Sequence, residues 1–318
     1  MISNQEPSIV VMTKKEQQFL DAAISGNLRV IAALLKGGVD VDVQDTRGLP
    51  TNRTALMHAA ENGHLEVVSF LIESGARVNS IDKGVPIDCP GGNTALILAI
   101  RNGHSKVAHR LLDAGASPKT KGGGTSVINA AAYFGEEGLV QRLIDLGADP
   151  RQRDGSGFCP IASALNNRNS NVVSLLLDMG IDPNSQSPGG SPIMRDAVYN
   201  GDIKICRMLI DKGANPELAD RDGFTPLMMA CAAVKVDAVR FLLSLQVAVN
   251  KQDNQGRTAL DIIRRQLEPD GFSPEVRQRL IKLGQYQPAP IKELRAIAVL
   301  LLRAGGKTGK ENILCSKN

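Results

Sequence analysis

Apolar and polar residues follow one another along this chain with the spacing of short amphipathic helices arranged in pairs. A first stretch rich in small apolar residues, such as Ala59 and Ala60, ends at a glycine, Gly63, and a second stretch with helical apolar spacing follows over residues 67–72. Thr, Ser or Pro precedes the first stretch, and Gly-Ala ends the second, as is typical of helix starts and ends. The pattern therefore predicts helix–turn–helix units joined by extended polar connections.

The helix pair recurs with a period near 33 residues. Two independent anchors keep this register. The first anchor opens the first helix of a pair at Thr54, Thr94, Ser126, Cys159, Pro192, Thr225 and Thr258. The second anchor ends the second helix at Gly38, Gly75, Gly115, Gly147, Gly180, Gly213 and Gln246. A regular period of this length predicts a repeat solenoid, in which each unit packs on its neighbours, rather than a globular domain with one central core.

The units resemble ankyrin repeats over roughly residues 16–306. The resemblance is carried by the opening Thr-Pro or Thr-Ala with Leu, the Ala pair, Gly-His before the second helix at Gly63-His64 and Gly103-His104, and Leu-Leu before Gly-Ala. It implies an all-α solenoid of about eight helix–turn–helix units with finger loops between them and atypical capping units at both ends. The expected units begin near residues 16, 46, 83, 122, 155, 188, 221 and 254, between an N-terminal arm (1–15) and a basic C-terminal tail (307–318).

The sequence departs from this pattern in three places. The first unit lacks the usual opening turn, so we expect its helix to begin at Glu16 as a capping unit. The last unit carries an insert over residues 268–290, with a further helix expected inside it, before its second helix resumes over 292–303. Arg168 and Val234 replace the glycine between the two helices of a unit, so we expect another turn geometry there.

Composition and charge narrow the classes of function. Of the 318 residues 42% are hydrophobic and only 3% are aromatic, with no Trp, which disfavours a base-stacking nucleic-acid platform. The net charge of +4 arises in residues 292–318, which hold six Lys or Arg and two acidic residues. Because a nucleic-acid binder normally lays basic residues along a face, we expect no nucleic-acid partner.

Short apolar runs and the cysteine pattern suggest the cellular setting. The runs Ile9 to Met12 and Ala296 to Leu302 are too short for a signal-peptide core or a membrane span, so we expect no membrane association. The five cysteines form no CxxC pair. We therefore expect a cytoplasmic protein with reduced thiols, without structural disulfides or zinc.

No constellation of residues predicts catalysis or a cofactor. The four histidines form no HxxxH pair, and the resemblance assigns His64 and His104 to local hydrogen bonds. The stretch Gly305-Gly306-Lys307-Thr308 lacks the first glycine of a phosphate-binding loop, because Leu301 stands there, and it follows a helix rather than a strand. We expect no catalytic residue, no metal, no cofactor and no small-molecule substrate.

The resemblance implies that a partner is contacted by finger residues and by the two residues that end each first helix. Carried over unit by unit, these are Arg53, Glu61 and Asn62; Asn93, Arg101 and Asn102; Thr125, Tyr133 and Phe134; Phe158, Asn166 and Asn167; Ser191, Tyr199 and Asn200; Phe224; and Arg257. The predicted contact set keeps twelve of these residues: Arg53, Asn62, Arg101, Asn102, Tyr133, Phe134, Phe158, Asn166, Asn167, Tyr199, Asn200 and Phe224. It leaves out Glu61, Asn93, Thr125, Ser191 and Arg257. Five of the ten aromatic residues of the chain fall in it.

These aromatic residues allow two interpretations. Phe158 and Phe224 precede the helix at equivalent places, which favours a shared packing role against a neighbouring turn. Tyr133 and Tyr199 occupy the same position in units two apart, and Phe134 adjoins the first, which favours anchors in a concave groove.

The leading interpretation is a monomeric protein–protein interaction module or scaffold that binds another protein in its groove. The alternative is a regulatory or host-directed adaptor that uses residues 268–318 as a second interaction site. The remote alternative is an enzyme that uses the insert in the last unit.

Overall fold

The computed structural model describes residues 12–47, 52–85, 89–90, 92–122, 124–267 and 290–309. The chain forms two compact parts, Met1–Leu175 and Leu176–Asn318, which we call the N-terminal block and the C-terminal block. The helix expected inside the insert lies outside the described residues and stays a prediction.

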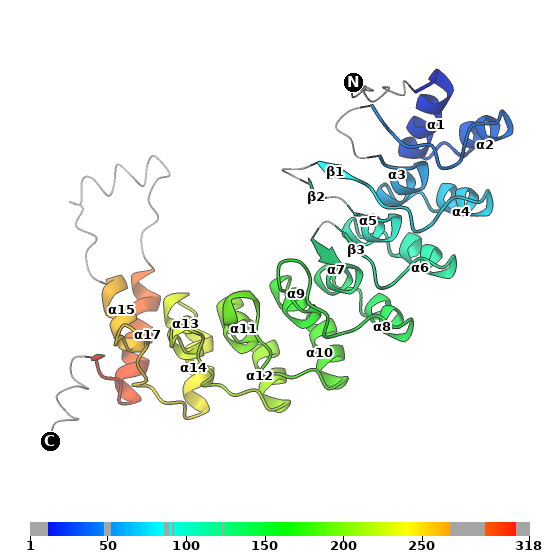
Figure 1. Ribbon diagram of the computed structural model, residues 1–318. Helices are drawn as coiled ribbons and strands as arrows, with labels where there is room; N and C mark the ends of the chain where they lie inside the picture. Colours follow the sequence, from blue (N-terminus) through cyan, green and yellow to red (C-terminus); the bar gives the residue numbers. More distant parts are fainter. Residues whose placement is uncertain are drawn as a thin grey trace, which may run out of the picture. The chain divides into compact units, whose positions relative to one another are not determined.

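The N-terminal block consists of helix pairs, in which we call the first helix inner and the second outer (Figure 1). The pairs are α1 (Lys14–Ser25) with α2 (Leu28–Lys36), α3 (Ala55–Glu61) with α4 (Leu65–Glu73), α5 (Ala95–Arg101) with α6 (Ser105–Asp113), and α7 (Val127–Phe134) with α8 (Glu137–Asp145). The inner helix α9 (Pro160–Asn166) follows, and its outer helix α10 (Ser170–Asp178) crosses into the C-terminal block. Inner helices pack on inner helices in chain order, from α1 to α9.

Two finger loops of the N-terminal block carry short antiparallel hairpins. Strand β1 (Gly84–Val85) pairs with β2 (Cys89–Pro90), and β3 (Lys121–Gly122) pairs with β4 (Thr125–Ser126). The fold of the described chain is therefore mostly helical, with strands only as two-residue pieces in the fingers.

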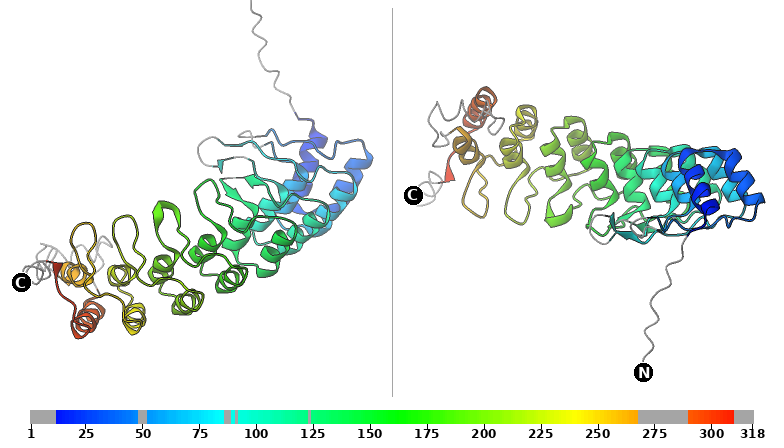
Figure 2. Two further views of the ribbon diagram at one scale, coloured as in Figure 1. Left: turned by 60° about the horizontal axis from the view of Figure 1, so that its bottom comes forward. Right: turned by 90° about the horizontal axis from the view of Figure 1, so that it is seen from above.

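The C-terminal block, taken by itself, also consists of inner and outer helices (Figure 2). A one-turn 3-10 helix, η1 (Pro188–Gly190), precedes α11 (Ile193–Asn200), and the chain then forms α12 (Ile203–Asp211), α13 (Pro226–Ala232), α14 (Val236–Ser244), α15 (Ala259–Leu267) and α17 (Ile291–Arg303). Inner helices α11, α13 and α15 pack in order, and so do outer helices α12, α14 and α17. The resumption of the last outer helix near residue 292 is confirmed.

Close packing of inner helices accounts for the small residues at their centres. Ala59 and Ala60 in α3, and Ala99 in α5, are completely buried. Two neighbouring helices can approach each other closely only if the residues at their contact are small. No unit buries its apolar face alone, so the core is one continuous layer within each block.

The predicted helix caps are confirmed where the capping residue has a hydroxyl group. The side chains of Thr54, Thr94, Ser126 and Thr225 each accept a hydrogen bond from the backbone N–H three residues later, at 3.2–3.3 Å. Cys159 occupies the same place in α9 and makes no such bond. Pro160 follows it as the first helical residue, where its fixed φ favours the helix start.

The turn between inner and outer helix has one geometry in every pair up to α13 and α14, including the two places where glycine is replaced. Gly63 has φ 76°, and Arg168 and Val234 have φ 58° and 54°, so all three are left-handed. The expectation of another geometry at Arg168 and Val234 is wrong. Each turn directs the next N–H back to a carbonyl of the inner helix, as from Asn169 to Ala164 at 2.9 Å. The left-handed backbone that this hydrogen bond requires outweighs the preference of Arg and Val for a negative φ.

The first repeat unit begins earlier than expected. Helix α1 begins at Lys14, because Thr13 and Glu16 form a reciprocal capping box in which the Thr13 hydroxyl accepts from the Glu16 N–H at 3.2 Å. Met12 is buried as well. The part of the expected arm from residue 12 onward therefore belongs to the packed array.

A core substitution tests the register of the helices. Leu176 in α10 is completely buried, so Leu176→Ala should lower the free energy of unfolding by about 2–5 kcal/mol, the usual range for a large-to-small core change. Leu146→Ala, at a half-exposed position, should cost less than about 1 kcal/mol. Chemical denaturation of both variants measures this. Equal losses would show that the register is misplaced.

A second substitution tests the strained turn. Arg168→Gly should raise the free energy of unfolding by up to about 1 kcal/mol, because a left-handed backbone costs any residue with a Cβ about 1–2 kcal/mol and glycine offsets part of the gain through its larger entropy loss. Arg168→Ala removes the same charge but keeps the Cβ, so it should bring no gain. A stabilisation shared by both variants would assign the effect to charge instead.

Candidate partner-binding surface

Three finger loops are each organised by an aspartate that the sequence analysis did not single out. One carboxylate oxygen of Asp220 accepts from the N–H groups of Asp222 at 3.0 Å and Phe224 at 2.8 Å. Asp253 does the same for Gln255 and Arg257. Asp154 repeats the arrangement in the N-terminal block. The aspartate recurs four residues before the residue that precedes the helix cap, so a fixed-offset comparison of the repeats would have found it.

The second oxygen of several finger aspartates binds an arginine. Arg257 binds Asp253 at 2.7 Å, and Arg195 binds Asp220. Burial alone would raise the pKa of Asp253, but hydrogen bonds from Arg257 and Gln255 outweigh it and hold that pKa below its ordinary value. At neutral pH these ion pairs hold the finger loops in place, and in each pair the arginine and the aspartate neutralise each other's charge.

Two positions chosen by resemblance are engaged inside the fold. Arg53 binds Glu61 at 2.6 Å and Asp82 at 3.3 Å, with most of its side chain covered. Asn93 is completely buried and donates from its backbone N–H to Asp82 at 2.8 Å, which contradicts its selection as a contact position. The reason is that Asp82 is itself buried and needs both neighbours as partners.

Tyr133 and Phe134 form an exposed aromatic pair at the end of α7. Their side chains are 41% and 44% exposed, and their rings meet edge to face with centroids 5.2 Å apart. The carbonyl of Tyr133 accepts hydrogen bonds from the side-chain amides of Asn167, at 2.8 Å, and of Asn169. The backbone beneath the pair is therefore fixed by the next repeat.

Polar residues at the neighbouring helix ends surround this pair. Asn166 and Asn167 end α9 and are exposed, as are Arg101 and Asn102 at the end of α5. Asn102 donates to the Leu98 carbonyl at 2.9 Å. Asn62, at the end of α3, makes the equivalent bond to His58. We call Tyr133, Phe134, Arg101, Asn102, Asn166 and Asn167 the helix-end surface.

The remaining predicted contacts fall into different environments. Tyr199 in α11 is 60% exposed, and Asn200 beside it is half-buried. Phe158 is half-buried, and its carbonyl accepts from the Asn129 side chain at 2.8 Å. Phe224 is half-buried as well, with the Arg195 guanidinium 5.9 Å from its ring centroid. The two phenylalanines are thus less exposed than Tyr133, Phe134 and Tyr199.

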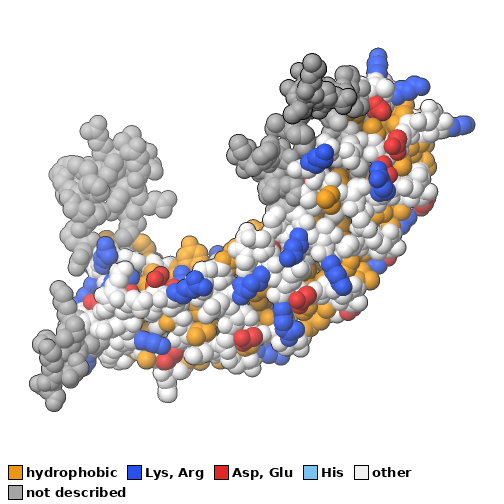
Figure 3. Space-filling model, in the orientation of Figure 1, with side chains coloured by type: hydrophobic (Ala, Val, Ile, Leu, Met, Phe, Trp, Pro, Cys, Tyr) orange, Lys and Arg blue, Asp and Glu red, His pale blue; other side chains and the backbone are white. Residues whose placement is uncertain are grey.

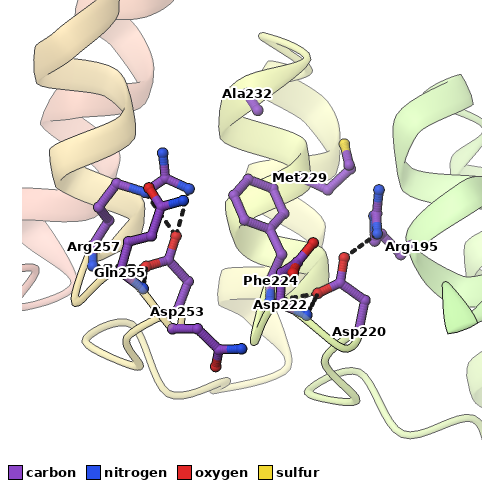
Figure 4. Close-up of a pocket in the computed structure, with 10 residues that line it drawn as sticks. Arg195, Asp220, Asp222, Phe224, Met229, Ala232, Asp253, Gln255 and Arg257 are labelled. Carbon is purple, nitrogen blue, oxygen red and sulfur yellow. Dashed lines mark hydrogen bonds and ion pairs between the residues drawn. The ribbon is translucent and has the colours of Figure 1, made fainter. Parts of the chain in front are cut away.

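Phe224 forms a wall of a cavity of about 380 Å³ in the C-terminal block (Figure 4). Met229 and Ala232 add apolar surface, and the Arg195–Asp220 and Arg257–Asp253 pairs stand on either side. Its arginines are thus already paired with carboxylates.

The buried cysteines do not supply a nucleophile. Cys159, Cys206 and Cys231 are free and buried. Burial raises the pKa of Cys206 to about 12 and also raises the pKa of Cys231. Both thiols are therefore protonated at neutral pH, and a thiol attacks only as the thiolate. Within the described ranges, His, Cys, Asp and Glu side chains form no group of three or more that could hold a metal ion.

Charge is mixed on the surface in view. On the face shown in Figure 3, Lys and Arg side chains stand among Asp and Glu side chains without gathering into one basic stripe.

None of the helices in the described part of the chain is long and apolar enough to cross a membrane.

The family is shown by comparison with known proteins. The model of ankyrin repeats (3 copies) matches residues 19–122 and 194–265, more than half of the chain. The protein belongs to the ankyrin repeat family. The crystal structure of the human ASB11 ankyrin repeat domain is similar in fold, with a TM-score of 0.63 and 23% sequence identity over 72% of this chain and 97% of that one. Comparison with curated proteins gives no match to the sequence.

The expected histidine contacts are also confirmed. His64 hydrogen-bonds to the Ile24 carbonyl at 2.9 Å and His104 to the Glu61 carbonyl at 3.0 Å, each reaching the preceding repeat.

His58 in α3 predicts a pH dependence of stability. Burial lowers the pKa of His58 below 6.5, and the opposing pull of Asp45, 3.3 Å away, does not offset it. Folding therefore favours the neutral ring, and the stability that this contributes is lost as the pH falls below the unfolded pKa of about 6.5. The free energy of unfolding should drop between pH 7 and pH 5, and less steeply in His58→Gln. Parallel pH profiles would show that His58 is not responsible.

Proposed function

We propose that this ankyrin repeat protein is a protein–protein interaction module whose N-terminal block holds a partner protein on the helix-end surface. The observation that carries the proposal is the exposed Tyr133–Phe134 pair in a chain with only 3% aromatic residues. Aromatic side chains provide a large contact area with few rotatable bonds, and they are enriched among interface anchors. Ankyrin repeats in general bind other proteins.

Preorganisation supports this assignment. The Tyr133 carbonyl is held by amides from the following repeat, and Phe134 lines a small cavity of about 120 Å³ with Ile100 and Leu139. The pair therefore stands on a backbone that need not rearrange when a partner binds. A surface that is ordered before binding loses little conformational entropy in the complex.

The finer parts of the proposal concern the cellular role. The chain acts as a monomeric cytoplasmic scaffold or adaptor rather than as an enzyme. The buried, protonated thiols and the mutually paired charges of the C-terminal cavity support a binding role over a catalytic one.

The test is capture of the partner from the native cell by wild type and by Tyr133→Ala/Phe134→Ala, followed by titration of the captured protein. The double variant should bind at least about a hundredfold more weakly, because such anchors each contribute about 2 kcal/mol or more. Its helical content should be unchanged, since both side chains lie at the surface.

The matched control is Leu146→Ala, which removes an exposed apolar side chain from the end of α8. It should bind like wild type. Unchanged affinity of the double variant would remove the helix-end surface as the binding site. A large drop in its melting temperature would instead assign the pair a structural role.

A further inference from the structure

The last described helix pair, α15 with α17, is joined differently from the pairs before it. In those pairs a short turn connects the inner to the outer helix, as residues 62–64 connect α3 to α4. Residues 268–290 stand between α15 and α17 instead. The two helices still pack on each other, and α17 also packs on α14 (Figure 1). The short turn that sets the position of an outer helix elsewhere therefore cannot set that of α17.

The chain that leaves α17 is tied to the start of the same pair. The backbone N–H of Gly309 donates to the Asp261 carboxylate at 2.7 Å, and the Gly309 carbonyl accepts from the Gln252 side chain at 3.2 Å. The Thr258 hydroxyl lies 2.7 Å from the Lys307 carbonyl and 2.9 Å from the Asp261 carboxylate, and its one hydrogen serves one of these acceptors at a time. We call these contacts the clasp.

Asp261 is an exception among the inner helices. It stands three residues after the residue that opens the helix, where no inner helix from α3 to α13 has an acidic residue. The equivalent residues are Met57, Ile97, Asn129, Ala162, Arg195 and Met228. The carboxylate oxygen that binds Gly309 also accepts from the Thr258 backbone N–H at 2.9 Å. One oxygen atom therefore holds both the start of α15 and the chain that follows α17.

Gly309 is an exception among the residues that follow the outer helices. It stands four residues after the left-handed Gly305, where the earlier units carry Asp42, Asn79, Lys119, Arg151, Asn184, Glu217 and Asn250. A Cβ on Gly309 would overlap the carbonyl oxygen of Gly256 in the finger loop. The close approach of the two backbones therefore requires glycine. It occurs in the same unit in which the inner helix supplies the carboxylate.

The clasp also brackets the finger loop beside the cavity. Gln252 and Thr258, which both contact the chain after α17, stand at the two ends of this loop. Between them Asp253 accepts from the N–H groups of Gln255 and Arg257, and these three residues line the cavity (Figure 4). Contacts that hold the ends of the loop therefore hold one wall of the cavity as well.

We propose that the clasp replaces the short turn in this pair: it holds α17 in register on α15 and couples α17 to the finger loop over residues 252–257. Helix α17 and this loop form one cooperative unit, which opens when Gly309 is released while α11 and α12 stay folded. Local opening of this kind commonly follows structural motifs. The shape of the cavity wall therefore depends on the glycine-rich stretch after α17. This device lies in the C-terminal block and is independent of the helix-end surface.

Hydrogen exchange on the full chain tests the clasp with Gly309→Ala. The added Cβ meets the Gly256 carbonyl and forces the two segments apart. Exchange over residues 291–303 and at the N–H groups of Gln255 and Arg257 should become at least about tenfold faster, because several hydrogen bonds that oppose local opening are lost together. Exchange in α11 and α12 should stay as in wild type.

The matched control is Gly138→Ala in α8. It makes the same chemical change where a Cβ meets no described atom within 4 Å and where the backbone is not left-handed. Exchange over residues 291–303 should be the same in this variant as in wild type.

A second variant, Asp261→Met, removes the carboxylate and introduces the residue that α3 and α13 carry at the same place. It should also speed exchange over residues 291–303, and it provides this readout even if Gly309→Ala does not fold. Because both substitutions break the same contact, the double variant should exchange no more than about twofold faster than the faster single variant.

Several results would overturn the proposal. Unchanged exchange over residues 291–303 in both single variants would show that the clasp does not hold α17. Faster exchange there without a change at Gln255 and Arg257 would show that the finger loop is not coupled to α17. Equal acceleration in α11, α12 and α17 would indicate a general loss of stability. Effects that multiply in the double variant would show that Gly309 and Asp261 act separately.

Discussion

The left-handed turn between the paired helices is the constraint on which the rest of the structure depends. It ends the inner helix, returns the chain to it through one backbone hydrogen bond, and leaves room for the next repeat. A Cβ on Gly26 would lie 2.6 Å from His64, and one on Gly63 would lie 2.5 Å from His104. The imidazoles occupy the space that glycine leaves open and bind a carbonyl of the preceding repeat. Register within a repeat and stacking between repeats are therefore set at the same place.

The aromatic pair depends on the same arrangement. In α7 the turn glycine is Gly135, and Asn169 of the following repeat takes the place of the histidine. Its amide binds the carbonyls of Ala132 and Tyr133, so that the stacking contact also holds the backbone under the exposed rings. An interaction that stabilises the array thus preorganises the surface proposed to bind a partner.

The sequence predicted the features that depend on local chemistry and on period. Helix caps such as Thr54 follow from a hydroxyl group near a helix start, and the pairing of helices follows from the 33-residue repeat. The turns at Arg168 and Val234 were mispredicted, because the local backbone hydrogen bond that closes each turn outweighs residue preference there. The burial of Asn93 could not be predicted either, since it depends on Asp82 lying inside a longer finger. Tyr133 is exposed and Phe158 is half-buried, and this difference depends on how the neighbouring fingers pack.

Hydrogen exchange on the complex with the captured partner tests the central claim most directly. If a partner protein binds the helix-end surface, protection on binding should concentrate at residues 131–135, at the end of α9 and at the end of α5, while the outer helices α4, α6 and α8 exchange as in the free protein. Protection confined to those outer helices, with residues 131–135 unchanged, would contradict the account.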